Sequence, residues 1–238
     1  MIHVGGHHIL WHIMKTYAHH GITDFILCLG YKGEMIKDYF LNYESMNNDV
    51  TVELGKKDGV RYHGSTHGET GWKVTLVDTG EDAMTGARVS RAARYLDEDD
   101  KAFCLTYGDG VSDVNISELV DFHSKHGAMA TVTGVMPPSR FGEILHEGEV
   151  VRAFAEKPQS GTRIINGGFF VLNREFVDYL SDDSSCVLER EPLERCVEDG
   201  NLRVYTHMGY WQCMDTYRDW ELLERDWNSG NAPWNDWA

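Results

Sequence analysis

Basic residues are scarce in this chain of 238 residues: 22 Lys and Arg stand against 38 Asp and Glu, which gives a formal net charge of -16. A surface this acidic offers no basic footprint for nucleic acid and is repelled by anionic lipid, so we expect neither nucleic acid nor a membrane as a partner. A negatively charged substrate then requires a locally positive pocket or a bound metal cation.

Long apolar runs and paired cysteines are also lacking. No stretch approaches the ~20 apolar residues that cross a bilayer, and the first residues lack the charged and apolar parts of a secretory signal. The cysteines number five, an odd count, and no Cys-x-x-Cys pair occurs, which favours neither a disulfide framework nor a thiolate metal site. We therefore expect a cytoplasmic protein.

Apolar residues are nevertheless frequent, at 42%, and they alternate between helical and strand patterns. Helical spacing predicts helices at 9–17 and 35–40, and short apolar runs predict strands at 25–29, buried on both faces, and at 73–77. A polar loop at 78–86 then leads to a predicted helix near 87–96.

The region from 102 to 135 is the best defined. It reads as a strand at 102–107, a helix through 116–123 and a second strand at 130–135. This βαβ order implies that the two strands run parallel. We therefore predict a Rossmann-like α/β fold with a mainly parallel sheet flanked by helices.

The pattern changes after Pro138. Segments 143–145 and 150–154 predict a β-hairpin, and 167–172 predicts a further strand. Helices are expected at 175–180, 187–197 and 217–227. We expect residues 1–238 to form a single domain in which 138–165 is a small β-rich insertion.

Asp109 is the most informative residue, because it lies between two glycines at the carboxyl end of a predicted strand. Ligands bind at that edge in open α/β sheets, and flanking glycines let a phosphate approach the backbone. The alternative is a turn aspartate that caps the following helix, and the motif alone favours neither.

Asp215 and Thr216 precede the last predicted helix, so either is a candidate N-cap. Asp215 is also a candidate second metal ligand beside Asp109. Two carboxylates on separate elements would suit Mg²⁺, which keeps several waters and bridges phosphates. We expect the two carboxylates to face one cleft.

Two further clusters contain residues of types that bind phosphates or metals. Glu156 and Lys157 stand before Pro158, where Lys157 is a candidate phosphate ligand and a solvated surface pair is the alternative. His8 and His12 have the one-turn spacing of metal ligands, but the sequence shows no third ligand, so we do not expect a zinc site.

These motifs coincide with those of a known family. The chain resembles the sugar-phosphate nucleotidyltransferases, and among them the glucose-1-phosphate cytidylyltransferases. The resemblance covers essentially the whole chain, and its matching segments are 9–15, 29–33, 74–80, 84–86, 105–111, 156–158, 165–172, 214–216 and 227–234.

The resemblance implies a reaction in which glucose 1-phosphate attacks the α-phosphate of CTP, releasing pyrophosphate and giving CDP-glucose for the deoxysugars of surface polysaccharide. It implies that Asp109 and Lys157 are catalytic and that Asp109 and Asp215 hold Mg²⁺. It assigns sugar-phosphate binding to Glu156, Lys157, Asn166 and Gly167, and nucleotide binding to Thr79, Gly80, Ala83, Arg88 and Gly108. It also implies a homo-oligomer.

The start of the chain departs from the family pattern. Relatives begin with a strand, a Gly-Gly-x-Gly-Thr-Arg loop and a Lys-Pro-Lys-Pro-Met segment, and Met1 falls on the methionine of that segment. His7 and His8 replace a Lys-Pro pair, and Ala83 stands where relatives have Ser or Thr. On this resemblance the chain is N-terminally truncated and lacks donors for a triphosphate.

Two alternatives follow from the missing segment. One is a catalytically impaired fragment, or a relic that binds a sugar phosphate or nucleotide, and the other is an enzyme for a different base or sugar. For the chain as written we expect poor folding, and turnover of CTP at least about a hundredfold slower than with the segment restored.

Overall fold

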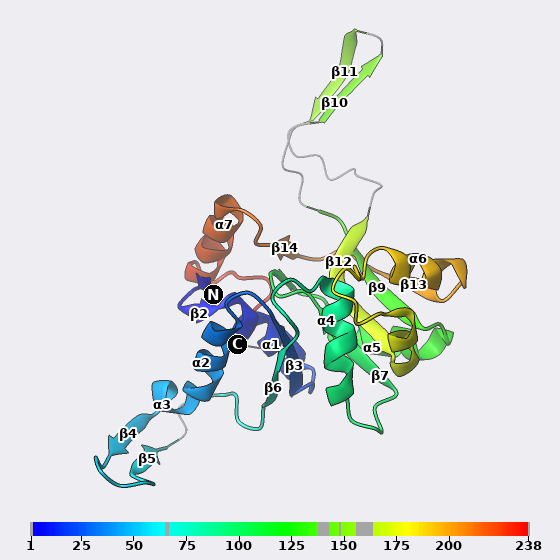
Figure 1. Cartoon of the computed structure of the whole chain (residues 1–238). Coiled ribbons are helices and arrows are strands. Elements are labelled where there is room, and N and C mark those ends of the chain that lie inside the picture. The colour runs from blue at the N-terminus through cyan, green and yellow to red at the C-terminus, as the bar shows by residue number, and fades with distance from the viewer. Residues whose placement is uncertain (1, 65–66, 138–142, 148, 156–163, 238) are drawn as a thin grey trace. The chain divides into compact units, whose positions relative to one another are not determined.

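The computed structural model describes residues 2–64, 67–137, 143–147, 149–155 and 164–237. The chain divides into two compact units. The first unit contains Ile22–Glu98 and Val177–Leu193, and the second contains Ile2–Gly21, Asp99–Phe176 and Glu194–Ala238. Figure 1 labels most of the helices and strands of both.

Two parallel strands form the centre of the first unit. β3 (Asp24–Leu29) pairs with β6 (Lys73–Asp78), and both predicted strands are confirmed. α2 (Gly33–Leu41) packs near β6, and α4 (Thr85–Ala92), followed by η1 (Ala93–Tyr95), packs near β3. Most side chains of β3 are half-exposed, so the prediction of a strand buried on both faces is wrong. The reason is that the described helices beside this two-stranded sheet, α2 near β6 and α4 near β3, leave part of its faces uncovered.

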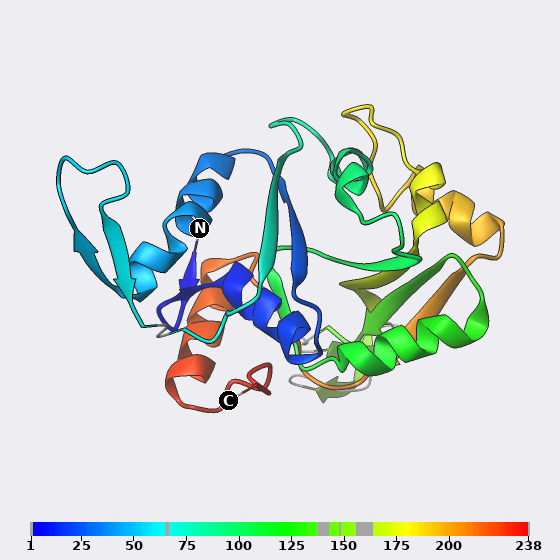
Figure 2. The same ribbon diagram turned by 90° about the horizontal axis from the view of Figure 1, so that it is seen from below.

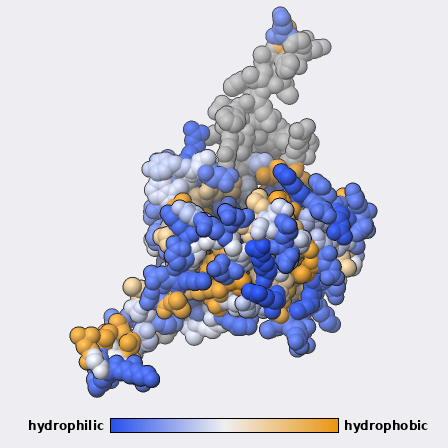
Figure 3. Space-filling model, viewed as in Figure 1, coloured by the Kyte–Doolittle hydropathy of each residue, from blue (hydrophilic) through white to orange (hydrophobic). Residues whose placement is uncertain are grey.

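The first unit also carries an arm that the sequence patterns did not predict. It consists of α3 (Tyr43–Asn47) and an antiparallel hairpin of β4 (Asp49–Val52) and β5 (Val60–His63). Val50 lies opposite Tyr62 and Val52 opposite Val60, so these apolar residues share one face of the hairpin. All four are exposed, and apolar colour gathers at this arm in Figure 3.

A four-stranded mixed sheet forms the centre of the second unit. Its order is β13 (Leu202–His207), β9 (Ala130–Val135), β12 (Ile165–Asn173) and β7 (Ala102–Thr106). β7 and β9 both run antiparallel to β12, so they run parallel to each other, as the βαβ pattern predicts. The strand predicted at 167–172 is confirmed as β12, but its antiparallel place between β7 and β9 was not predicted, because that place is set by pairing with distant segments.

α5 (Ile116–His126) connects β7 to β9 and packs against β9 and β12, as Figure 2 shows. Its Ile116 and Leu119 are fully buried, together with Phe169, Phe170 and Leu172 of β12. His123 lies in this core and its two ring nitrogens bond to Thr131 Oγ1 and Asn173 Oδ1, both at 2.9 Å. The sheet and α5 thus form a closely packed base for the loops at the strand ends.

The hairpin predicted after Pro138 is confirmed as β10 (Glu143–Glu147) paired with β11 (Val150–Ala155). The helix predicted at 175–180 is the 3₁₀ segment η2 (Arg174–Tyr179). α6 (Glu191–Glu198) starts later than the predicted 187. Pro192 explains this late start, because a residue without an N–H fits only in the first turn of a helix.

The ends of the second unit pack together. β1 (His3–Val4) and β2 (His7–His8) lead into α1 (Ile9–His19), and α7 (Tyr217–Asn228) contacts β1. His12 is fully buried, its Nε2–H donates to the Val4 carbonyl at 2.9 Å, and its Nδ1 accepts from Trp234 Nε1–H at 3.4 Å. His12 is therefore a bonded core residue rather than a metal ligand.

The described helices include none that is both long and apolar enough to cross a membrane.

Candidate functional site

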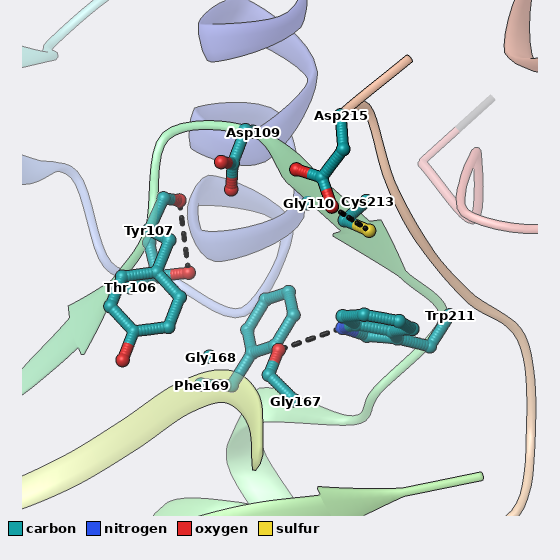
Figure 4. Close-up of a pocket in the computed structure, with 10 residues that line it drawn as sticks. All are labelled: Thr106, Tyr107, Asp109, Gly110, Gly167, Gly168, Phe169, Trp211, Cys213 and Asp215. Carbon is teal, nitrogen blue, oxygen red and sulfur yellow. Dashed lines mark hydrogen bonds between the residues drawn. The ribbon is translucent and has the colours of Figure 1, made fainter. Parts of the chain in front are cut away.

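An open pocket in the second unit brings together residues from three segments, 106–110, 167–169 and 211–215 (Figure 4). Asp109 and Asp215 lie on one side of it, and their carboxylates face the same cleft. This placement agrees with the expectation that the two carboxylates face one cleft. The pocket is lined by Thr106, Tyr107, Asp109, Gly110, Gly167, Gly168, Phe169, Trp211, Cys213 and Asp215.

Asp109 is positioned by the short sheet that follows β7. β8 (Gly110–Ser112) pairs antiparallel with β14 (Trp211–Cys213), which places Gly110 opposite Cys213. The Met214 N–H donates to the Asp109 carbonyl at 2.8 Å and extends this pairing. The N-cap of α5 is Asn115, whose Oδ1 accepts from the Glu118 N–H at 3.0 Å. The alternative of Asp109 as a helix cap is therefore wrong.

Asp215 lies between β14 and α7, and it is not the cap of α7 either. Thr216 is the N-cap and forms a capping box with Asp219: Asp219 N–H donates to Thr216 Oγ1 at 3.3 Å, and Thr216 N–H donates to Asp219 Oδ2 at 2.9 Å. Gln212 Nε2 donates to Asp219 Oδ1 at 3.1 Å, which ties β14 to the start of α7. The carboxylate of Asp215 therefore faces the pocket.

The electrostatics of the pair favour a cation. Loss of water around the carboxyl of Asp109, and then the charge of Asp215, raise the pKa of Asp109 above its ordinary value. A bound divalent ion would relieve both effects. Two carboxylates fit Mg²⁺, which takes one or two of them and completes its shell with waters and phosphate oxygens. Among the described residues, no group of three His, Cys, Asp or Glu is placed to hold a metal.

Aromatic residues form the other walls of the pocket. Gly168 has φ +79°, and a Cβ there would lie 2.5 Å from the Tyr107 ring. Asn166 joins these two residues: its Oδ1 accepts from the Gly168 N–H at 2.8 Å and its Nδ2 donates to Tyr107 Oη at 3.1 Å. Trp211 Nε1 donates to the Gly167 carbonyl at 2.7 Å. Gly167 thus lines the same pocket as the two aspartates, and Asn166 bonds to two other residues of its lining.

The residues expected to contact the nucleotide are divided between the two units. Thr79, Gly80, Ala83 and Arg88 lie in the first unit, and Gly108 lies in the second, next to Asp109. Thr79 Oγ1 donates to the Leu29 carbonyl at 2.8 Å and accepts from Arg88 Nη1 at 3.1 Å. Gly80 takes φ +96°, and Ala83 is buried. Glu156 and Lys157 fall outside the described residues.

Sequence reasoning missed Trp211 and Cys213 as pocket residues. They precede Asp215 at intervals of two, which is the period of a strand with one face toward the pocket. β14 has three residues, too few for that alternation to be recognised in the sequence.

Comparison with known proteins agrees with this geometry. Residues 1–220 match the family model for nucleotidyl transferases. The chain belongs to the nucleotidyl transferase family. Its expected membership of a family of enzymes is therefore confirmed.

Two relatives and one solved structure are informative. Glucose-1-phosphate cytidylyltransferase of Salmonella typhi is 47% identical over 237 residues, which are 100% of this chain and 90% of that protein. A protein described as a probable glucose-1-phosphate cytidylyltransferase, of Bacillus subtilis (strain 168), is 44% identical over 98% of this chain and 89% of its own length. HddC from Yersinia pseudotuberculosis superposes with a TM-score of 0.67 at 20% identity, over 95% of this chain and 88% of that one. The Rossmann-like α/β fold is thus confirmed.

Proposed function

We propose that the chain transfers CMP from CTP to glucose 1-phosphate, forming CDP-glucose and releasing pyrophosphate. The observation that carries this proposal is the 47% identity to a cytidylyltransferase for glucose 1-phosphate across the whole chain. The pocket with Asp109 and Asp215 gives the proposal a chemical basis. The product would serve the synthesis of surface-polysaccharide deoxysugars in the cytoplasm.

In this reaction the sugar phosphate is the nucleophile and pyrophosphate is the leaving group, so catalysis consists mainly of alignment and charge neutralisation. Asp109 and Asp215 would hold Mg²⁺. When bound, the ion neutralises phosphate charge near the reacting phosphorus. Loss of water around the Asp109 carboxyl, and then the charge of Asp215, raise the pKa of Asp109, and a bound cation would offset both effects.

We assign the sugar-phosphate side to Asn166 and Gly167, with Glu156 and Lys157 added by resemblance. Tyr107 and Trp211 form aromatic walls of the same pocket. Thr79, Gly80, Ala83, Arg88 and Gly108 are assigned to the nucleotide by resemblance. Residues 1–238 are proposed to form one nucleotidyltransferase domain with 138–165 as its sugar-binding insertion.

The chain is also proposed to assemble with copies of itself. The exposed apolar face of the β4–β5 hairpin supports this, because a hairpin of two strands is marginally stable alone. The hairpin, residues 49–63, carries three basic residues (Lys56, Lys57 and Arg61) and three acidic ones (Asp49, Glu53 and Asp58). It is therefore neutral within a chain of net charge -16, and it can approach a second copy without the repulsion that the other surfaces experience.

The test is product formation by the purified chain with Mg²⁺, CTP and glucose 1-phosphate, followed by pyrophosphate release and mass spectrometry of the nucleotide sugar. We expect CDP-glucose, with slower reaction when CTP is replaced by UTP, dTTP or GTP. Faster reaction with another base would reject the choice of CTP. Binding of both substrates without any turnover would favour a binding protein instead.

A further inference from the structure

β14 directs its side chains alternately toward and away from the pocket. Trp211 and Cys213 line the pocket, as does Asp215 two residues further on. Gln212 points the other way and is buried against Asp219. The side chain of Cys213 is therefore held on the pocket side by the pairing of β14 with β8 rather than by chance rotation.

The thiol of Cys213 contacts the proposed metal-binding pair directly. Its Sγ–H donates to Asp215 Oδ2 at 3.2 Å, which is the dashed line between these residues in Figure 4. The backbone of Cys213 lies opposite Gly110, the neighbour of Asp109. Cys213 thus links the element that carries one aspartate to the carboxylate of the other.

The contact between Cys213 and Asp215 orients a carboxylate that the capping box of α7 leaves unfixed. Thr216 and Asp219 fix the first turn of α7, but the box leaves the Asp215 carboxylate to be oriented by other groups. The negative charges of Asp109 and Asp215 repel each other and favour rotation of the two side chains apart. A donor on Asp215 Oδ2 opposes that rotation. S–H is a weak donor, but a hydrogen bond to a charged acceptor is stronger than one to a neutral acceptor.

We propose that Cys213 is a positioning residue that orients the Asp215 carboxylate so that Asp109 and Asp215 bind one divalent cation together. The proposal rests on the proposed function and deepens it, because it assigns to the pocket a residue that sets its affinity for the cation. Cys213 itself is not proposed as a metal ligand.

The test compares the wild-type chain with Cys213→Ala, which loses the donor, and Cys213→Ser, which keeps one. Two quantities are measured: the Mg²⁺ concentration for half-maximal activity, and the rise in melting temperature caused by Mg²⁺ alone. Cys213→Ala should require roughly three- to tenfold more Mg²⁺ and show a smaller thermal shift, as loss of one hydrogen bond predicts. Cys213→Ser should stay within about twofold of wild type.

Cys196→Ala is the matched control, because Cys196 is buried on α6 and does not line the pocket. It should lower stability without changing the Mg²⁺ requirement. KM for glucose 1-phosphate should change less than the Mg²⁺ requirement in Cys213→Ala. An unchanged Mg²⁺ requirement in Cys213→Ala, or a Ser variant as impaired as the Ala variant, would overturn the proposal.

The thermal shift separates this proposal from the proposed function. If the wild-type chain made no CDP-glucose, the proposed reaction would be rejected, and the effect of Mg²⁺ on the melting temperature would still compare the variants. If Mg²⁺ gave the wild type no thermal shift, the positioning role would be rejected whatever the reaction.

Discussion

Near the pocket, one residue caps each helix and a different residue faces the pocket. Thr216 caps α7 while Asp215 faces the pocket, and Asn115 caps α5 while Asp109 faces the pocket. Because a residue of each pair satisfies the helix end, the aspartate is available for a ligand. This division gives the two carboxylates a role that helix capping does not explain.

Asp109→Asn should lower cytidylyl transfer by about a hundredfold or more, because the amide removes half of the paired charge that attracts the cation. It should also abolish most of the thermal stabilisation by Mg²⁺. Asp121→Asn on the exposed side of α5 is the control and should behave as wild type in both measurements. Equal Mg²⁺ stabilisation in Asp109→Asn would reject Asp109 as a ligand.

His12 should make the protein sensitive to acid. Burial lowers the pKa of His12 from 6.5 to about 4, the Val4 carbonyl partly opposes this, and His7 adds to it. The unfolded chain takes up a proton first, so stability is full above about pH 6.5 and is lost as the pH falls toward about 4. The loss attributable to His12 is on the order of 3 kcal/mol.

Urea unfolding between pH 4 and 8 measures this effect. His12→Gln should be less stable than wild type at neutral pH, because two buried hydrogen bonds change. The stability of this variant should also depend less on pH. His19→Gln is the control, because His19 is exposed on the same helix. A wild-type stability that stayed constant between pH 6.5 and 4.5 would contradict the assignment.

Gly168 should tolerate no side chain. Its φ of +79° disfavours other residues, and a Cβ would meet the Tyr107 ring at 2.5 Å. Gly168→Ala should cost about 2–4 kcal/mol of stability and raise KM for glucose 1-phosphate. Gly200→Ala measures the cost of the backbone conformation alone, because Gly200 has φ +69° and open space around it. This variant should lose about 1 kcal/mol of stability. Equal losses in the two variants would show that the clash with Tyr107 is relieved by a small movement.

At the scale of single residues, the sequence indicates which side chains could bind a ligand better than it indicates which residues lie beside them. Asp109 and Asp215 were identified because Gly-Asp-Gly and Asp-Thr have local meanings at a strand end and a helix start. Trp211 and Cys213 were missed, because their position depends on pairing between β14 and β8, which are about a hundred residues apart. Long-range pairing of this kind leaves little local pattern.

Among the elements, α1, α2, α5 and α7 were predictable because helical spacing is a local property. The position of β12 between β7 and β9 was not, because register and order depend on distant segments. The strands β4 and β5 have four residues each, too few for their alternation of apolar and polar residues to be recognised in the sequence.

The start of α7 should affect both stability and the site. Thr216→Ala removes the cap and should cost about 1 kcal/mol. Since Thr216 follows Asp215 directly, the variant should also need more Mg²⁺ for activity. Asn115→Ala removes an equivalent cap from α5 and should lower stability by a similar amount without changing the Mg²⁺ requirement. Chemical unfolding measures the stability of both variants, and titration of activity with Mg²⁺ measures their Mg²⁺ requirement. If Thr216→Ala needed no more Mg²⁺ than Asn115→Ala, the role of Thr216 would be structural only.

For the whole molecule, charge determines which surfaces of two copies can associate. Most surfaces of a chain with net charge -16 repel one another, whereas the β4–β5 hairpin is neutral and exposes Val50, Val52, Val60 and Tyr62 on one face. Apolar faces that meet lose contact with water, which stabilises association by about 25 cal/mol per Å² of buried apolar surface.

Val52→Asp should therefore weaken self-association, because the new carboxylate lies in the centre of the apolar face opposite Val60. Thr51→Asp adds the same charge to the opposite face of the same strand, and should leave association unchanged. Light scattering coupled to gel filtration measures the mass of each species against the 27.1 kDa of one chain. We expect a multiple of that mass for wild type and Thr51→Asp, and a smaller species for Val52→Asp. A wild-type mass of one chain, or no difference between the two variants, would show that this face does not join copies, because a buried unpaired charge at a true interface costs several kcal/mol.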